Sequence, residues 1–283
     1  MSVANAKDIA PVIGQDEKIE EKTEEIVKAD SGKTIAGLPI LHAREAIDHT
    51  NYLIYGDPGS GKTTLAASAS IVETMTPVLL IDVEGGTKSI RKLYPDIDII
   101  RVKTIYDRGG RVKKSAWDQL NDIYEHAKLK GEYGTYIIDS LSEVYWINMA
   151  DWMVEVLLEH PERDADIPAQ KDYLKAGSRT KKMVRQYRDL DANVIFTALK
   201  ATITNDSGGL VNYTPALPGK LAYEIAAFVD EVFYLYTKTE KEETKRVILT
   251  ENANKYLAKD RSDNLPRTVD RPTMAGLSAA ILD

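Results

Sequence analysis

One stretch near residue 60 has the composition and spacing of a phosphate-binding loop. It reads Gly56-Asp57-Pro58-Gly59-Ser60-Gly61-Lys62-Thr63-Thr64. Its glycines allow the backbone to bend until successive N–H groups point inward, where they can bind a phosphate. Lys62 can then reach the β- and γ-phosphates of a nucleotide, and the Thr63 hydroxyl can bind Mg²⁺. The alternative is a Gly-rich turn that carries Lys-Thr by chance.

The segments on either side of this loop favour the first interpretation. Residues 51–55 are apolar and strand-like, and residues 65–73 follow a helical pattern. A P-loop joins a buried strand to the beginning of a helix, whose N-terminus favours negative charge. The order of the three segments therefore predicts a P-loop.

A carboxylate follows another apolar run and could activate a water molecule. Residues 77–83 have the continuous apolar pattern of a strand buried on both faces, and they lead into Asp82-Val83-Glu84-Gly85-Gly86. Ligands bind beyond the carboxyl ends of strands in open α/β sheets, so Glu84 is placed to polarise a water against the γ-phosphate. The alternative for Glu84 is a solvated loop carboxylate.

A second carboxylate ends a third run of the same kind. Residues 135–140 repeat the buried-strand pattern, with Asp139 at its end. This pattern, downstream of a P-loop, is typical of the Walker B element. We expect Asp139 to hold Mg²⁺ together with Thr63, and to do so through a water, because Mg²⁺ gives up its hydration shell reluctantly.

The rest of the chain alternates between strand and helix patterns, which predicts an α/β fold with a mostly parallel sheet. Helical patterns are expected at 89–94, 115–130, 142–160 and 221–228, and an apolar turn is expected at 277–282. Further strands are expected at 37–43, 98–102, 193–199, 229–236 and 247–250. The first of these is expected to be an edge strand, and the alternative is a segment that contacts a neighbouring subunit. Hairpins are expected at 200–215 and at 237–244. Antiparallel strands should therefore close the C-terminal part of the sheet.

Bulk composition limits the chemistry that is available. The 283 residues include no Cys and four His, which excludes disulfides, thiolate metal sites and thiol catalysis. Mg²⁺ held by oxygen ligands is the expected metal. No run of 18 apolar residues is present, and Lys7 and Asp8 interrupt the start, so we expect neither a membrane span nor a secretory signal. The expected location is the cytoplasm.

The negative charge is concentrated at the start of the chain. The net charge is −7, and residues 1–30 hold eight acidic side chains against four Lys. We expect residues 1–32 to form an acidic, disordered tail and residues 33–283 to form a single domain. A short helix at 17–27, or a tail that docks on a partner or screens a basic groove, is the alternative.

The most basic helical stretch lies between residues 171 and 188. It holds Lys171, Lys175, Arg179, Lys181, Lys182, Arg185 and Arg188. Asp172 and Asp189 are the acidic residues that oppose them along the stretch. A solvated helix face is the default explanation. A face that binds nucleic-acid phosphates is the alternative, with Lys175, Arg179, Lys181, Lys182 and Arg185 as candidates.

These motifs together resemble the RecA/Rad-type branch of P-loop ATPases. Within it the sequence looks like the compact phage-encoded ATPases, an AAA-domain group that includes single-strand annealing recombination proteins of the Sak class. The resemblance covers about residues 37 to 270 and is carried by Gly-Asp-Pro-Gly-Ser-Gly-Lys-Thr-Thr at 56–64, Ile-Asp-Val-Glu-Gly-Gly at 81–86, Tyr-Ile-Ile-Asp-Ser at 136–140 and Lys-Asp-Arg-Ser at 259–262. It implies a RecA-like core that binds ATP and Mg²⁺.

The resemblance also implies roles for individual residues around the nucleotide. Glu84 is the implied general base, because in this branch the glutamate follows the strand after the P-loop helix. Glu143 is the competing base, since another branch places the glutamate directly after the Walker B aspartate, a position that Ser140 holds here. Arg91 matches a residue that stacks on adenine. Lys200 matches a polar sensor.

Assembly and a polymer partner follow from the same resemblance. The family forms rings or filaments in which a cation from one subunit reaches the neighbour's γ-phosphate, and Lys259 and Arg261 match the region that supplies it. The 161–170 loop and the 200–215 hairpin match the two DNA-contacting loops. Here the hairpin offers only Lys200 and Tyr213, and no N-terminal DNA-binding domain precedes the core, which weakens the DNA assignment.

The sequence therefore predicts an ATP-hydrolysing protein that acts on single-stranded DNA in phage recombination. Annealing and strand exchange are both compatible with this prediction, as is contact with a phage single-strand-binding or replication protein. The alternatives are a replication or helicase-loading ATPase, and a nucleotide-dependent switch that acts on a protein without DNA. A small-molecule phosphotransferase is disfavoured because no lid with converging arginines is visible.

Overall fold

The computed structural model describes residues 33–40, 49–205, 208–240, 243–253 and 255–282. The chain divides into two compact units, residues 1–48 and 49–283. In the first unit the described residues form a hairpin of β1 (Thr34–Ile35) and β2 (Leu38–Pro39). Of the predicted edge strand at 37–43, residues 38–39 form β2, which pairs with β1 in a separate two-stranded sheet, and residues 41–43 lie outside the described residues. The acidic tail and the 17–27 helix lie outside the described residues.

The second unit is built on a nine-stranded sheet with the order β13-β12-β11-β3-β9-β8-β4-β5, in which β10 also pairs with β9. The strands from β11 to β5 are parallel to their neighbours, whereas β10, β12 and β13 are antiparallel. The bounds are β3 Asn51–Gly56, β4 Val78–Asp82, β5 Asp98–Arg101, β8 Thr135–Asp139, β9 Asn193–Thr204, β10 Leu210–Pro215, β11 Glu231–Glu240, β12 Glu243–Leu249 and β13 Thr268–Asp270.

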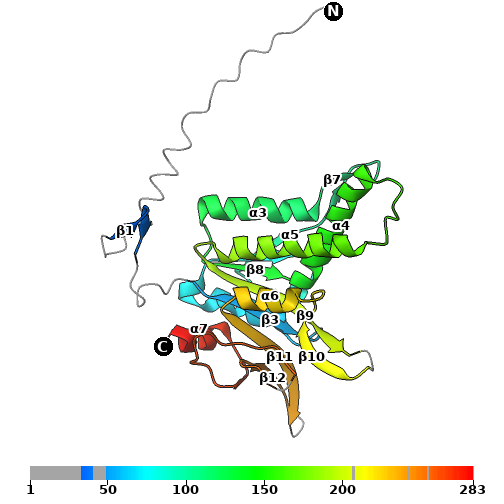
Figure 1. Ribbon diagram of the computed structural model, residues 1–283. Helices are drawn as coiled ribbons and strands as arrows, with labels where there is room; N and C mark the ends of the chain where they lie inside the picture. Colours follow the sequence, from blue (N-terminus) through cyan, green and yellow to red (C-terminus); the bar gives the residue numbers. More distant parts are fainter. Residues whose placement is uncertain (1–32, 41–48, 206–207, 241–242, 254, 283) are drawn as a thin grey trace, which may run out of the picture. The chain divides into compact units, whose positions relative to one another are not determined.

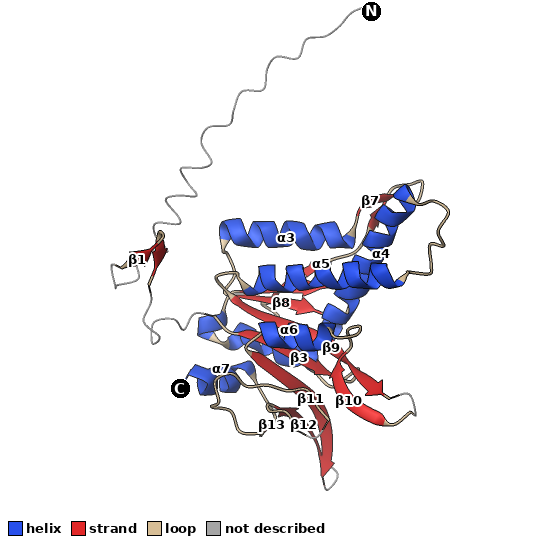
Figure 2. Ribbon diagram, in the orientation of Figure 1, coloured by secondary structure: helices blue, strands red, loops and turns tan. Residues whose placement is uncertain are grey.

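Helices cover both faces of this sheet (Figures 1 and 2). One face carries α3 (Ala116–Lys130), α4 (Leu141–Glu159), α5 (Gln170–Arg188) and α6 (Leu221–Phe228), and the other carries α2 (Lys62–Ala67) and α7 (Met274–Leu282). The predicted α/β class, with a mostly parallel sheet between helices and antiparallel strands at the C-terminal end, is confirmed. None of the described helices is long and apolar enough to cross a membrane.

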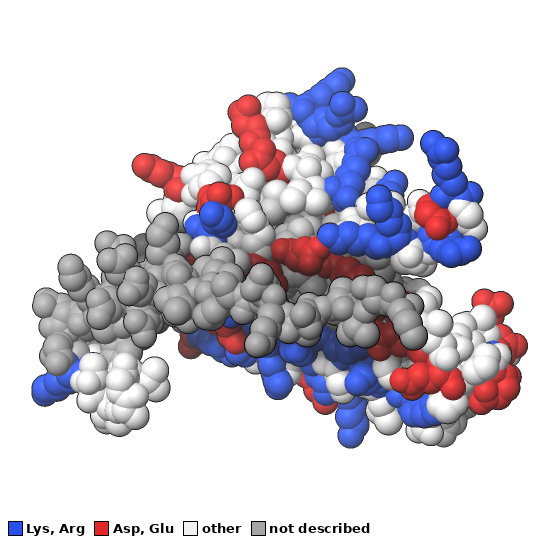
Figure 3. Space-filling model, turned by 90° about the horizontal axis from the view of Figure 1, so that it is seen from above, with Lys and Arg blue, Asp and Glu red and all other residues white. Residues whose placement is uncertain are grey.

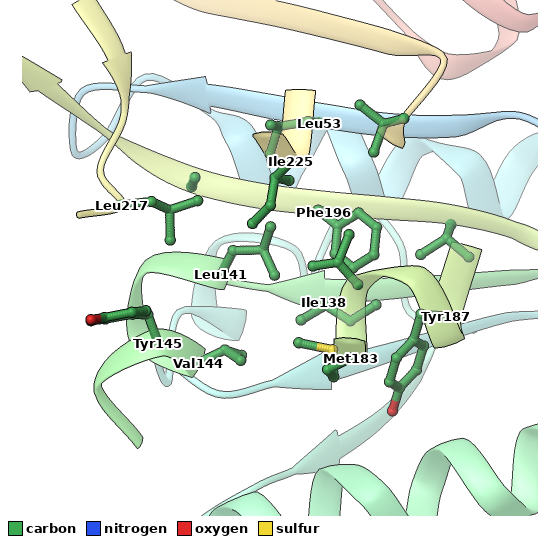
Figure 4. Packing of buried hydrophobic residues seen from close by; sticks show 14 of the residues in the cluster. Leu53, Ile138, Leu141, Val144, Tyr145, Met183, Tyr187, Phe196, Leu217 and Ile225 are labelled. Atoms are coloured by element: carbon green, nitrogen blue, oxygen red, sulfur yellow. The ribbon is translucent and has the colours of Figure 1, made fainter. Parts of the chain in front are cut away.

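Alternation along the strands creates the two halves of the core. In β3, Leu53 and Tyr55 pack towards α3–α6, while Tyr52 and Ile54 pack towards α2 and α7. The central strands β3, β4 and β8 are therefore buried at every position, as expected for parallel strands covered on both faces. On the larger side, Phe196 packs among side chains from the neighbouring strands and helices (Figure 4).

Several connections differ from the sequence-based expectation. The helix predicted at 65–73 is the six-residue α2 followed by the 3₁₀ segments η2 (Ser68–Ile71) and η3 (Glu73–Met75). The helix predicted at 89–94 is wrong, because the chain there forms only the short η4 (Thr87–Ser89) and turns. A small hairpin of β6 (Ile105–Tyr106) and β7 (Val112–Lys114) was not predicted.

Candidate nucleotide-binding site

The predicted phosphate-binding loop leaves the carboxyl end of β3 and enters α2. Gly56 closes β3 between β11 and β9, and a Cβ at this position would overlap the Leu235 carbonyl oxygen. Gly61 has a φ of 102°, which L side chains rarely adopt, and it precedes the first residue of α2 without a side-chain cap. Gly56 thus allows close strand pairing, and Gly61 allows the turn into the helix.

Lys62 lies inside this loop. Its ammonium Nζ donates to the carbonyl oxygens of Gly56 and Asp57 at 3.1 and 3.0 Å. Burial lowers the pKa of Lys62, while the negative charges of Glu84, Asp139 and Asp57 act in the opposite direction. The loop carbonyls and the nearby carboxylates thus offset part of the cost of burying the Lys62 ammonium.

The Asp139 carboxylate accepts hydrogen bonds from hydroxyl groups on two elements. Thr63 Oγ1 donates to Asp139 Oδ2 at 2.7 Å, and Thr197 Oγ1 on β9 donates to Oδ1. Asp139 is almost fully buried at the end of β8. The structure thus brings Thr63 and Asp139 together as predicted from sequence. The contact of Thr197 was not predicted from sequence, because Thr197 lies beside Asp139 only through the pairing of β8 with β9.

Glu84 lies in a turn that Asp82 and Asp139 hold in place. Asp82 Oδ1 accepts the backbone N–H groups of Gly85 and Gly86 at 2.6 and 3.2 Å. The Asp139 carbonyl oxygen accepts the N–H of Glu84 at 3.1 Å. The Glu84 side chain is exposed, and its charge acts on Lys62. Its competitor Glu143 is exposed on the first turn of α4.

The residues of the loop fit a nucleotide with Mg²⁺. Ser60 Oγ and Ser140 Oγ are both buried and have no hydrogen-bond partner among the described residues. Such orphaned groups cost free energy unless a ligand or water satisfies them. The described residues contain no cluster of three or more His, Asp or Glu that could hold a metal ion. Thr63 and Asp139 would therefore hold the metal together with phosphate oxygens, as suits Mg²⁺.

Arg246 on β12 lies against the same loop and was not predicted from sequence. Its Nε donates to the Ser60 carbonyl oxygen at 3.2 Å, and a Cβ on Gly61 would lie 2.8 Å from its Cδ. Arg246 has no carboxylate partner in the part of the chain that the structure describes. It borders a hollow of about 380 Å³, which is lined by Thr237, Thr244, Lys245, Arg246, Arg271 and Pro272.

The sequence matches the family model described as an AAA domain over residues 48–262. The match spans most of the chain and contains the loop, Glu84 and Asp139. The chain belongs to this AAA domain family. A search of curated proteins found no match.

Two solved structures are similar to this AAA-domain protein. A KaiC-like protein from Pyrococcus horikoshii is 16% identical, with 71% of this chain and 78% of that chain covered and a TM-score of 0.39. The flagellar accessory protein FlaH from Methanocaldococcus jannaschii is 12% identical, with 80% of this chain and 86% of that chain covered and a TM-score of 0.40.

Lys200 connects the P-loop of the AAA domain to the β9–β10 hairpin. Its Nζ donates to Asp57 Oδ2 at 2.8 Å and lies 5.1 Å from the centre of the Tyr213 ring. Tyr213 in turn stacks on Tyr256, with ring centres 4.5 Å apart. The candidate sensor and the candidate stacking residue are therefore neighbours, and both lie beside the nucleotide loop.

The candidate trans cations lie towards the amino end of β11. Lys259 Nζ donates to the carbonyl oxygens of Ala226 and Val229 at the end of α6, and burial lowers its pKa. Arg261 Nη1 pairs with Asp230 Oδ1 at 2.6 Å, but about half of its side chain is exposed. Arg261 is thus the more accessible of the two.

The remaining candidate around the nucleotide is Arg91. The structure places it in the turns that follow η4, with an exposed side chain. Its predicted stacking on a base stays a prediction.

The cations of α5 are more neutralised than the sequence suggested. Arg179 pairs with Asp151 and Glu155 of α4 at 2.5 and 2.9 Å, and Lys181 pairs with Glu224 of α6 at 3.0 Å. Neutralisation therefore goes beyond the Asp172 and Asp189 that the sequence places along the stretch, because these further carboxylates come from other helices and are distant in sequence.

Two further cations of α5 lie over aromatic rings of neighbouring helices. Arg185 lies over the ring of Phe228 at 4.2 Å, and Lys175 lies over the ring of Trp152 at 5.1 Å. Lys182 is exposed. Most cations of α5 therefore pack against α4 and α6, which favours a structural role for this helix.

Proposed function

We propose that this AAA domain binds ATP with Mg²⁺, hydrolyses it, and couples the reaction to single-stranded DNA in annealing or strand exchange during phage recombination. The observation that supports hydrolysis most directly is the convergence of Lys62, Thr63 and Asp139 beside the exposed Glu84. These are the groups that phosphoryl transfer to water needs: a phosphate cradle, metal ligands and a residue that orients the water.

Each of these residues has a separate part in the proposed reaction. Lys62 binds the β- and γ-phosphate oxygens, and Thr63 and Asp139 would hold Mg²⁺, which supplies positive charge to the phosphates. Glu84 orients the attacking water and accepts its proton. The exposed Arg261 is the better candidate for a cation that a neighbouring subunit supplies in a ring or filament. Such a cation is worth about 10³-fold or more in rate, so an isolated subunit should hydrolyse slowly.

The link from nucleotide to polymer is proposed to run through Lys200. Its ammonium bridges Asp57 in the P-loop and Tyr213 in the β9–β10 hairpin. A nucleotide that changes the position of Asp57 would also change the hairpin that faces a polymer. The hairpin thereby becomes sensitive to the nucleotide state.

Arg246 is expected to bind the nucleoside end of ATP. The catalytic carboxylates lie on the β8 and β4 side of the P-loop, whereas Arg246 and its hollow lie on the β11 and β12 side. Replacing Arg246 with Ala should weaken ATP binding about tenfold, the effect of losing one hydrogen bond from a charged group. Titration with a fluorescent ATP analogue measures this.

Inorganic tripolyphosphate and a matched variant provide the controls for Arg246. Tripolyphosphate lacks the nucleoside, so Arg246→Ala should leave its affinity unchanged. Arg267→Ala removes an arginine that pairs with the exposed Glu251 and does not line the hollow, and it should bind ATP normally. Equal losses of ATP and tripolyphosphate would show instead that Arg246 only supports the loop.

A partner protein is the second candidate for the macromolecule on which the ATPase acts. On α4, Trp146, Val154 and Leu158 form an apolar stripe and are 52%, 49% and 81% exposed. Exposed apolar stripes on a helix are typical of protein contacts. This observation favours the loading or switch function, in which nucleotide hydrolysis changes a protein complex without DNA.

Hydrolysis measured with and without single-stranded DNA separates the two functions. We expect the wild-type protein to hydrolyse ATP faster with DNA and to lose this stimulation as salt is raised, because phosphate contacts are salt-dependent. Lys62→Ala should be inactive under every condition. Hydrolysis that requires Lys62 but ignores DNA would exclude the DNA function and leave the protein-directed one.

A further inference from the structure

The β6–β7 hairpin is the most basic exposed segment of the described chain outside α5. Residues 101–114 contain six Lys or Arg and one acidic residue, Asp107. Every residue from 105 to 114 is exposed, including Tyr106 at 60%. Seen from above, Lys and Arg side chains gather towards the upper right, on the side of the molecule that carries β7 in Figure 1 (Figure 3).

The cations at the tip of this hairpin differ from those of α5 in having no acidic partners. Arg108, Arg111 and Lys113 form no ion pair with any residue in the described ranges. Lys114, at the base, pairs with Asp122, and Arg101 approaches Asp82 at 3.7 Å. The hairpin therefore keeps three positive charges outside any ion pair among the described residues, whereas α5 is largely neutralised by its neighbours.

The single carboxylate of the hairpin is used to build its turn. Asp107 Oδ1 accepts the backbone N–H groups of Gly109 and Arg111 at 2.7 and 2.9 Å, and Gly110 has a φ of 79°. Where the hairpin joins α3, Thr104 Oγ1 accepts the N–H of Ala116 at 3.2 Å. The positive side chains are thus carried by an ordered backbone turn, so little backbone entropy is lost when they bind.

The hairpin emerges at the same edge of the sheet as the nucleotide site. Arg101 ends β5 and pairs in register with Asp82 of β4, which in turn pairs with Asp139 of β8. The carboxyl ends of β3 and β9, from which the P-loop and the β9–β10 hairpin leave, lie at this edge too. In Figure 1 both hairpins extend towards the right of the molecule.

We propose that the β6–β7 hairpin binds the phosphate backbone of single-stranded DNA through Arg108, Arg111 and Lys113, with Tyr106 stacking on a base. The proposal rests on the DNA part of the proposed function and places the main contact away from α5. Cations beside an exposed aromatic ring are the combination with which proteins bind single strands: the cations hold phosphates, and the ring stacks on any base. An acidic protein segment would pair with the cations but would have no base to stack on the Tyr106 ring.

The test is the binding of a fluorescently labelled thymidine 30-mer to the full chain at several salt concentrations. Arg108→Ala/Arg111→Ala/Lys113→Ala should weaken binding and reduce the salt slope of log K by about 2, because each single-strand phosphate contact contributes about 0.7. Tyr106→Ala should weaken binding about tenfold with an unchanged slope, because stacking involves no counterion. Hydrolysis of ATP without DNA should stay at the wild-type rate in both variants.

A matched variant removes the same number of charges elsewhere. Lys128→Ala/Lys130→Ala/Arg267→Ala changes the far end of α3 and an arginine paired with Glu251, and it should bind the 30-mer like wild type. Equal losses in the two triple variants, or wild-type binding by the hairpin variant, would overturn the proposal. So would competition by poly-glutamate as strong as that by unlabelled 30-mer. Wild-type protein that binds no DNA would contradict the DNA function itself.

Discussion

Replacing Glu84 with Gln should lower ATP hydrolysis by about 10²- to 10³-fold, within the range typical for loss of a general base. The substitution keeps the shape of the side chain but removes its ability to accept a proton. The turn should survive, because Asp82 and the Asp139 carbonyl hold it through backbone N–H groups. ATP affinity should therefore remain within about twofold of wild type. Single-turnover hydrolysis and nucleotide titration measure the two quantities separately.

Glu143→Gln is the matched control for this prediction. Glu143 is also exposed and lies just beyond Asp139, on the first turn of α4. Since the backbone of Glu84 is hydrogen-bonded to the Asp139 carbonyl oxygen, beside the contact of Asp139 with Thr63, hydrolysis should depend on Glu84 and proceed at close to the wild-type rate in Glu143→Gln. The reverse pattern, with Glu143→Gln inactive and Glu84→Gln active, would assign the base to the helix and contradict the proposal.

The parts of the molecule that were predictable from sequence are those defined by local patterns. The P-loop and the strands that end at Asp82 and Asp139 were predicted because continuous apolar runs bounded by glycines and carboxylates are a local signal. Parallel pairing then brings strand ends to one edge, which explains why Thr63 and Asp139 meet. The AAA-domain core was therefore predictable from its motifs.

Contacts made across the sheet could not be predicted in this way. Arg246 contacts the P-loop because the sheet order places β12 two strands from β3, with β11 between them. Thr197 contacts Asp139 because β9 pairs with β8. The same limit applied to charge: the carboxylates that neutralise Arg179 come from α4. A count of charges along the chain therefore overestimated the basic character of α5.

Replacing Asp139 with Asn should remove most of the contribution of Mg²⁺ to nucleotide affinity. In the structure both carboxylate oxygens accept hydroxyl groups, from Thr63 and from Thr197. Asn has a similar shape but offers one acceptor and no charge, so it can neither hold both hydroxyls as acceptors nor attract a divalent cation. Wild-type protein should bind ATP more tightly with Mg²⁺ than with EDTA, and Asp139→Asn should show nearly equal affinities.

Thr197→Val distinguishes a metal role from a purely structural one. Thr197 holds the same carboxylate from the β9 side but is not expected to bind the metal, so this variant should keep the preference for Mg²⁺ even where overall affinity falls. Loss of affinity in Asp139→Asn that is the same with Mg²⁺ and with EDTA would show that the carboxylate only orders the loop. If Asp139 binds the metal, replacing it weakens ATP binding only when Mg²⁺ is present. If Asp139 only accepts the two hydroxyl hydrogen bonds, replacing it has the same effect with and without Mg²⁺. Measuring ATP affinity as Mg²⁺ is titrated therefore decides between these roles.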